Sequence, residues 1–346
     1  MARILYGVHT TGQGHVLRAL TVARNFPEHD FFFVCQGSKA NLLLGEYPVE
    51  EIPSPDTVIR GHKVDLAATV LNGAKVLVSY KRWLRRVVAI VESFKPDVAL
   101  ADMNFFVGLA ARETGLPCVS LDHGHILTCC RFPVPFWARP RVKLDQLAIK
   151  LLYSNAFHYL IATFFRPQLK SNAKATLVGP ILRGSVLTRE PSDAGHVLAF
   201  KSFSAFEALL PILRNLSRRV VVYGYDRQAS DGNLEFKKRS DEGFLDDLAA
   251  CSYLICGGGH TVVSEALHYG KPVLCFPGYY FEQELSAHYV DRLGYGLQAT
   301  GHPRPNALMG FEARLDNFRQ NIPDNSFCGN EEAFARLEEF FRGTTP

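Results

Sequence analysis

The chain has 346 residues, enough for about two domains at roughly 150 residues each. Hydrophobic residues make up 47% of it and charged residues 21%, a balance that excludes a disordered chain, a collagen-like repeat and a small disulfide scaffold. The 38 basic and 34 acidic residues give a net charge of +4, which argues against a dedicated nucleic-acid-binding protein.

Cysteine usage and hydropathy indicate the compartment. The eight cysteines form no C-x-x-C pair, and most stand singly in apolar runs, where a reduced thiol packs as a small hydrophobic group. No apolar run reaches the roughly 18–20 residues that span a bilayer, and the first residues lack the features of a signal peptide. We expect a cytoplasmic protein with no structural metal.

The first half of the chain alternates short apolar runs with helical patterns, which is typical of a parallel sheet with crossover helices. Strands are expected over residues 4–8, 30–35, 97–102 and 117–122. Helices are expected over residues 16–25 and 106–114, a long helix within 66–94, and a glycine-rich turn over 9–15. Residues 126–141 contain three prolines and are expected to form a loop, followed by a helix over 142–154 and strands over 158–163 and 175–178.

The second half repeats this architecture. Strands are expected over residues 196–200, 219–223, 253–256 and 272–276, and helices over 203–216, 243–250, 261–269 and 283–293. The repetition predicts two Rossmann-like domains, an amino-terminal one over 1–180 and a carboxy-terminal one over 181–330. A last helical pattern predicts that residues 331–346 cross back to pack on the first domain.

The turn Thr11-Gly12-Gln13-Gly14-His15 follows the first strand, and open α/β sheets bind ligands at the carboxyl ends of their strands. The turn lacks the third glycine of a dinucleotide fingerprint. His15 suits a general base, because histidine changes protonation near neutral pH; the alternative is a residue that only fastens the helix start to the loop. Asp102 ends another strand at the same edge, where it can orient His15 or cap the next helix.

A second candidate is the run Gly257-Gly258-Gly259-His260, between a strand and a helix. Its backbone N–H groups and the field of the helix suit an anion such as a phosphate. No lysine follows as in a P-loop, which argues against nucleoside-triphosphate hydrolysis. Glu265 lies about one turn into the helix, where it can accept hydrogen bonds from a ribose diol or be ordinary helix chemistry.

The order of residues in this region carries a family resemblance. Residues 255–296 contain, in sequence, Gly258-Gly259, Glu265-Ala266, Gly270-Lys271-Pro272, Pro277, Glu282-Gln283, Ala287 and Gly294-Tyr295-Gly296. This order resembles the donor-binding segment of GT-B glycosyltransferases. The whole chain is similar to the bacterial and archaeal UDP-glycosyltransferase-like group related to the lipid-linked GlcNAc transferase of peptidoglycan synthesis. The resemblance implies an α/β GT-B fold, with two Rossmann-like domains facing across a cleft.

The resemblance also implies roles for single residues. Those assigned to the nucleotide-sugar donor are Gly14, Arg183, Lys201, Phe236, Phe244, Gly258, Gly259, His260, Thr261, Glu265, Glu282 and Gln283. Within that set, the glycine-rich run and Arg183 would hold the diphosphate, Glu265 the ribose, and Glu282 with Gln283 the transferred sugar. The nucleobase would lie against the backbone near Phe236, with Phe244 below it. The catalytic pair would be His15 and Asp102, and the acceptor side would be formed by Gln13, Asn104, His123 and His125.

The chain departs from the family pattern at two places. Val262 stands where relatives carry a hydroxyl residue three positions before the glutamate, although Thr261 precedes it. Lys201-Ser202-Phe203 replaces the glycine-rich loop after the first strand of the second domain. Lys201 can supply positive charge to a phosphate there or be a solvated loop residue.

Two further segments have a chemistry of their own. The basic run at 81–86 and the aromatic segment at 132–141 can contact an anionic membrane surface, or the run can be a solvated helix face. Asp122-His123-Gly124-His125 follows a strand and can line the acceptor pocket, but the two histidines lack further ligands nearby in sequence for a metal.

With these residues, the resemblance implies an inverting, metal-independent glycosyltransferase without a cofactor. It would move a sugar from a nucleoside-diphosphate sugar, with uridine favoured by the resemblance, to a hydroxyl of an envelope glycan, a lipid carrier or a small metabolite. The alternatives are a UDP-GlcNAc 2-epimerase, a nucleotide-sugar hydrolase and a non-catalytic sugar-nucleotide-binding protein. No nucleic-acid partner is expected.

Overall fold

The computed structural model describes residues 1–10, 12–37, 43, 45–55, 57–60, 63–203, 205–278, 280–299, 301, 303–324 and 327–343. Thr11 of the predicted turn and Ser204 of a predicted helix lie outside these residues. Contacts divide the chain into two compact units. Unit 1 comprises Met1–Ile59, Val64–Ile181 and Gly329–Pro346, and unit 2 comprises Arg60–Lys63 and Leu182–Cys328.

Unit 1 contains a seven-stranded parallel sheet in the order β11-β9-β7-β6-β1-β2-β3. Its strands are β1 Arg3–Val8, β2 Asp30–Cys35, β3 Val49–Glu51, β6 Val98–Asp102, β7 Cys118–Asp122, β9 His158–Ala162 and β11 Ala175–Val178. Its helices are α1 Gly14–Asn25, α3 Leu66–Val78, α4 Tyr80–Phe94, α5 Phe105–Thr114, α6 Ile126–Cys129, the 3-10 helix η2 Phe136–Ala138, α7 Arg139–Leu152 and α15 Asn330–Phe341. A short strand pair in this unit is formed by β8 Cys130–Arg131 and β10 Gln168–Leu169. A second pair, β4 Ile59–Arg60 with β5 Lys63–Val64, contains Arg60 and Lys63, which are counted with unit 2.

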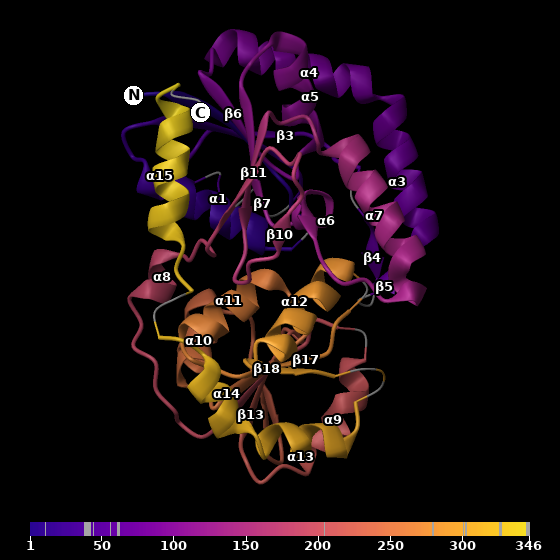
Figure 1. The fold of residues 1–346 in the computed structure, drawn as a ribbon, viewed down its shortest axis with the longest axis vertical. Helices are drawn as coiled ribbons and strands as arrows, with labels where there is room; N and C mark the ends of the chain where they lie inside the picture. The colour runs from indigo at the N-terminus through magenta and orange to yellow at the C-terminus, as the bar shows by residue number, and fades with distance from the viewer. Residues whose placement is uncertain are drawn as a thin grey trace. The chain divides into compact units, whose positions relative to one another are not determined.

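Alternation along β1 divides the core of unit 1 between the two faces of the sheet. Ile4 and Tyr6 point into a cluster that also contains buried residues of α1 and α15, whereas Leu5 points into a cluster with α4 and α5. The last helix packs Leu337 and Phe341 into the first cluster, and in Figure 1 the yellow α15 lies against unit 1. The terminal segment is thus part of the core of unit 1.

Unit 2 repeats the plan with the strand order β14-β15-β13-β12-β16-β17-β18, in which β14 is antiparallel to its neighbour. Its strands are β12 Val197–Phe200, β13 Val220–Tyr223, β14 Ala229–Asp231, β15 Leu234–Phe236, β16 Tyr253–Cys256, β17 Val273–Cys275 and β18 Gly296–Gln298. Its helices are α8 Gly184–Leu187, α9 Phe206–Arg214, α10 Asp241–Ala250, α11 His260–His268, α12 Phe281–Arg292, α13 Pro305–Glu312 and α14 Leu315–Asn321. The predicted α/β class with parallel sheets is confirmed.

The long helix predicted within residues 66–94 is present as α4, and α3 precedes it. The two helices meet at Ser79, whose hydroxyl donates to the Lys75 carbonyl and accepts from the Trp83 indole. One local prediction is wrong. The predicted loop over 126–141 contains α6, η2 and the start of α7. The prolines were the reason for predicting a loop. Pro140, however, occupies the first turn of α7, where a missing N–H costs no hydrogen bond. None of the helices in the described ranges is both long and apolar enough to cross a membrane.

Candidate functional site

The candidate site in unit 1 lies at the carboxyl ends of β1, β6 and β7. These strands are parallel neighbours, and the register pairs Val8 at the end of β1 with Asp102 at the end of β6. The His9 N–H donates to the Asp102 carbonyl at 2.9 Å, which fastens the turn after β1 to this strand end. The order of the sheet also reverses here, because β2 and β6 lie on opposite sides of β1, and such switch points bind ligands in open α/β sheets.

His15 and Asp102 come together at this edge, as the sequence predicted. His15 Nδ1 lies 2.7 Å from Asp102 Oδ1; the carboxylate is fully buried, while the His15 side chain is 24% exposed. Because an ionised carboxylate can only accept, Nδ1 donates the hydrogen in this contact, and Nε2 is left with the lone pair. The geometry therefore presents a base whose far side is held by a buried carboxylate.

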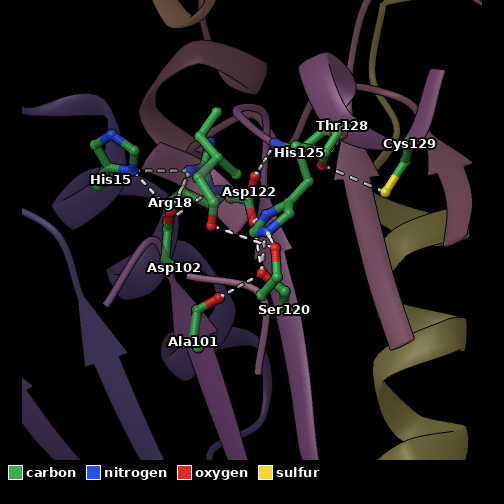
Figure 2. Close-up of polar contacts among 11 residues, drawn as sticks. His15, Arg18, Ala101, Asp102, Ser120, Asp122, His125, Thr128 and Cys129 are labelled. Atoms are coloured by element: carbon green, nitrogen blue, oxygen red, sulfur yellow. Dashed lines mark hydrogen bonds and ion pairs between the residues drawn. The ribbon is translucent and has the colours of Figure 1, made fainter. Parts of the chain in front are cut away.

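Arg18 is the residue of this site that sequence reasoning missed. Its guanidinium donates to both carboxylate oxygens of Asp102 at 2.7–2.9 Å, as Figure 2 shows. Arg18 Nη2 also lies 3.1 Å from His15 Nδ1, but two donors form no hydrogen bond when Nδ1 carries its proton. Burial lowers the pKa of Arg18, but the charge and hydrogen bonds of Asp102, together with Tyr6 and Asp122, raise it above the ordinary value overall. The available signal was its spacing, three residues beyond His15 on the same helix face.

A second polar network lies beside the first, at the end of β7 (Figure 2). His125 Nδ1 contacts Asp122 Oδ2 at 2.6 Å, and Ser120 donates to the same carboxylate at 2.5 Å. Burial by itself raises the pKa of Asp122. The charge and hydrogen bonds of His125, together with the hydrogen bond from Ser120, more than offset burial, so the pKa lies well below its ordinary value. His125 is fully buried, and its Nε2 faces the Ser154 hydroxyl at 3.4 Å. The prediction that His125 contacts an acceptor is therefore corrected: both ring nitrogens face internal partners.

The other three predicted acceptor residues have different surroundings. Asn104 is buried, caps α5 through the Val107 N–H at 3.0 Å and donates to the Val34 carbonyl at 3.2 Å, so its role is structural and the prediction is corrected. His123 is also buried; its Nδ1 donates to the Ala162 carbonyl at 2.8 Å, and burial lowers its pKa to about 4. Gln13 stands at the start of α1 and is half-buried, next to Gly14 and His15.

In unit 2 the glycine run joins β16 to α11. Gly258 has a φ of +79°, and a Cβ there would lie 2.8 Å from the Gln283 carbonyl, so the close approach of this loop to α12 requires glycine. Gly259 precedes α11 and has no side chain that could cap the first N–H groups of the helix. These N–H groups are suited to binding an anion. Gln283 is fixed by its Oε1, which accepts from the Gly278 N–H at 3.2 Å.

Arg183 and Glu265 form an ion pair that the sequence did not predict. Arg183 Nε donates to Glu265 Oε1 at 3.0 Å, and both side chains are largely buried. Burial raises the pKa of Glu265 above its ordinary value, and the Arg183 charge opposes this effect. The sequence predicted that Arg183 and Glu265 bind different parts of the donor, whereas in this structure they bind each other.

Comparisons with known proteins identify the family of the chain. The sequence profile of Glycosyl transferase family 1 matches residues 2–316. The chain belongs to this family. It is 24% identical to an uncharacterized glycosyltransferase of Methanosarcina acetivorans over 97% of this chain and 94% of that one.

Solved structures show the same fold. The calicheamicin glycosyltransferase CalG4 superposes with a TM-score of 0.68 at 18% identity, covering all of both chains. UGT89C1 of Arabidopsis thaliana, complexed with UDP, superposes with a TM-score of 0.67 at 13% identity over 99% of this chain and 100% of that one. The predicted GT-B glycosyltransferase family is thereby confirmed, and the chain is an enzyme of this class.

Three predicted donor residues of the glycosyltransferase have internal contacts. Lys201 Nζ lies 2.7 Å from Glu207 Oε1 and 3.8 Å from the centre of the Tyr225 ring, so its charge is already engaged. The Phe236 ring is buried in the core of unit 2, which leaves only its backbone for a base. Phe244 is half-buried and packs edge-on against Tyr223.

Three further predicted donor residues lie on α11 and α12, whereas Gly14 begins α1 in unit 1. His260 is buried, whereas Thr261 in the first turn of α11 and Glu282 in the first turn of α12 are half-buried. Among the residues that the structure describes, one trio of possible metal ligands occurs, Glu28, His29 and Glu338. It contains none of the predicted site residues of the glycosyltransferase.

Proposed function

We propose that this glycosyltransferase transfers a hexose or N-acetylhexosamine from a UDP-sugar to an acceptor hydroxyl with inversion of configuration, without a metal or cofactor. The contact between His15 and the buried Asp102 carries the proposal. Nε2 of His15 takes the proton of the acceptor hydroxyl, and Asp102 stabilises the imidazolium that forms. The acceptor oxygen then attacks the anomeric carbon as the bond to the nucleoside diphosphate breaks, so configuration inverts.

The donor half of the proposal rests on α11 and the residues around it. The N–H groups that follow Gly259 and the field of the helix stabilise the charge of the leaving diphosphate. Glu265, held by Arg183, accepts hydrogen bonds from the ribose, and Glu282 with Gln283 binds the transferred sugar. UGT89C1, a solved protein of the same fold, is complexed with UDP, which supports a nucleotide-linked donor.

The first experiment is a thermal-shift screen of the full chain against UDP- and TDP-linked sugars, followed by turnover assays with the donor that binds. We expect His15→Ala to lower turnover at least 100-fold, by order of magnitude, with the donor dissociation constant changed less than about two-fold. Activity should persist in EDTA. Normal turnover of His15→Ala would remove this residue from the mechanism.

The same assays separate the alternatives. Release of free sugar from the nucleotide sugar at equal rates with and without an acceptor would instead indicate a hydrolase or epimerase. Donor binding without turnover of any acceptor, unchanged in His15→Ala, would indicate a non-catalytic binding protein. Retention of the donor's anomeric configuration in the product would contradict inversion.

A further inference from the structure

The segment formed by η2 and α7, residues 136–152, exposes large apolar side chains on the surface of unit 1. Its five exposed members are between 52% and 74% exposed and comprise Phe136, Trp137, Leu144, Leu147 and Leu151. The three leucines are spaced by three and four residues and share one face of α7, while Val142 and Ile149 are buried on the opposite face. The helix is therefore apolar on two sides, although only one is covered by unit 1.

The same segment is strongly basic. Residues 136–152 contain four basic side chains and one acidic one, a net charge of +3 (4 − 1), against +4 for the whole chain. By helical geometry, Arg139, Lys143 and Lys150 lie along one flank of the leucine stripe, and all three are exposed. An exposed apolar stripe flanked by cations is the pattern of a helix that lies in the interface of an anionic membrane.

The charge of the segment also indicates which partner covers its apolar surface, a membrane or a second copy of this chain. A second copy of this chain, docked through the same surface, would bring two segments of +3 together, which is unfavourable. The basic run at 81–86, which the sequence suggested for the membrane, is partly engaged in contacts within unit 1. Arg86 pairs with Glu50, and the Arg82 guanidinium lies 5.1 Å from the centre of the Trp83 ring.

We propose that η2 and α7 form a docking surface for an anionic phospholipid bilayer. Phe136, Trp137 and the leucine stripe enter the region between headgroups and acyl chains, where aromatic side chains are favoured. Arg139, Lys143 and Lys150 contact the lipid phosphates. The surface uses none of the proposed catalytic or donor residues, so its test is independent of the proposed function.

The test uses the full chain and vesicles of phosphatidylcholine, with and without phosphatidylglycerol. We expect flotation with the anionic vesicles, weaker flotation with the neutral ones, and release at about 0.5 M salt. Phe136→Ser/Leu147→Ser and Arg139→Glu/Lys143→Glu should each weaken binding about ten-fold or more. The matched controls, Met309→Ser at an exposed site of unit 2 and Lys174→Glu/Arg304→Glu at other exposed sites, should bind as the native chain does.

Tryptophan fluorescence locates the contact. The chain has two tryptophans, Trp83 and Trp137, so Trp83→Phe leaves the exposed Trp137 as the reporter. Its emission should shift to shorter wavelength with anionic vesicles and be quenched by brominated acyl chains. Absence of vesicle binding by the folded protein would overturn the proposal, as would binding that the Phe136/Leu147 variant retains in full. A dimer in solution that this variant converts to monomers would show that a second copy covers the surface instead.

Discussion

Arg18 holds the Asp102 carboxylate through both oxygens, with Nε 2.9 Å from Oδ2 and Nη2 2.8 Å from Oδ1. Arg18 and Asp102 are both buried, so the pair places opposite charges in contact where neither is stable alone. Asp102 Oδ1 also meets His15 Nδ1. The rigid fork of Arg18 therefore fixes the plane of the carboxylate that orients the proposed base.

We predict that Arg18→Met lowers kcat about 100-fold or more, because a misdirected Asp102 no longer holds His15. It should also lower the free energy of unfolding by about 3 kcal/mol, because a buried carboxylate loses its counter-charge. Arg18→Lys keeps the positive charge but loses the paired N–H groups of the guanidinium. Compared with Arg18→Met, it should restore the free energy of unfolding more fully than kcat. Kinetics and urea unfolding of the variants measure both effects.

Arg24→Met is the matched control on the same helix. Arg24 pairs with Glu46 at a site where both side chains are exposed, so its loss should change stability by less than about 1 kcal/mol and leave kcat unchanged. A loss of stability in Arg18→Met with native kcat would mean that Arg18 only supports the fold.

The sequence predicted the parts of the site that depend on strand ends. His15 and Asp102 were paired because parallel strands of one sheet end at the same edge, and the register of β1 with β6 places them there. Arg18 was missed because a helix-periodic arginine has the same pattern whether it is buried or solvated. The three-residue spacing between His15 and Arg18 predicts a shared partner only when Asp102 is known to face α1.

Local sequence patterns do not predict contacts between residues that are far apart in the chain. Arg183 and Glu265 are 82 residues apart, and each was assigned separately because nothing in sequence links them. Asn104 and His125 were expected to face a ligand because they follow strands at the site. Their burial is set by neighbouring elements, namely Val34 on β2 for Asn104 and Ser154 after α7 for His125.

The Arg183–Glu265 pair gives a second prediction. Glu265→Gln should weaken nucleotide-sugar binding about ten-fold, since hydrogen bonds to a charged acceptor are replaced by weaker ones. Arg183→Met should lower the free energy of unfolding by about 3 kcal/mol, because it leaves Glu265 buried and uncompensated. Calorimetry with the donor and urea unfolding measure these changes.

A double variant tests whether the pair acts as one unit. Arg183→Met/Glu265→Met removes both charges and should be more stable than Arg183→Met alone. Arg189→Met is the control, since its partners Glu242 and Asp246 are mostly exposed, and it should change stability by less than about 1 kcal/mol. If the effects of Arg183→Met and Glu265→Met, measured singly, add up to that of the double variant, the pair contributes no coupling.

Gly258 and Gly259 provide a matched third prediction. Gly258→Ala combines a positive φ with a Cβ 2.8 Å from the Gln283 carbonyl, and it should lower the free energy of unfolding by about 2 kcal/mol. Gly259 has a φ of −61°, and a Cβ there meets nothing closer than Val262 at 4.0 Å, so Gly259→Ala should cost less than about 1 kcal/mol. Equal losses in the two variants, by urea unfolding, would contradict the strain assigned to Gly258.

His123 makes stability depend on pH. Burial lowers its pKa to about 4 in the folded chain, whereas an unfolded chain restores the ordinary value near 6.5. Between these values the unfolded chain binds more protons, so stability is full above pH 6.5, decreases as the pH falls to about 4, and is then constant. The buried imidazole should account for up to about 3 kcal/mol of this loss.

His123→Asn isolates this effect, because the asparagine amide can replace Nδ1 as donor to the Ala162 carbonyl. The free energy of unfolding of the native chain should fall more steeply between pH 6.5 and 4 than that of the variant. Asp122 does not interfere, since its lowered pKa removes stability only as the pH falls below its ordinary value near 3.8. Parallel pH profiles for the two proteins would mean that His123 is protonated in the folded state at mildly acidic pH.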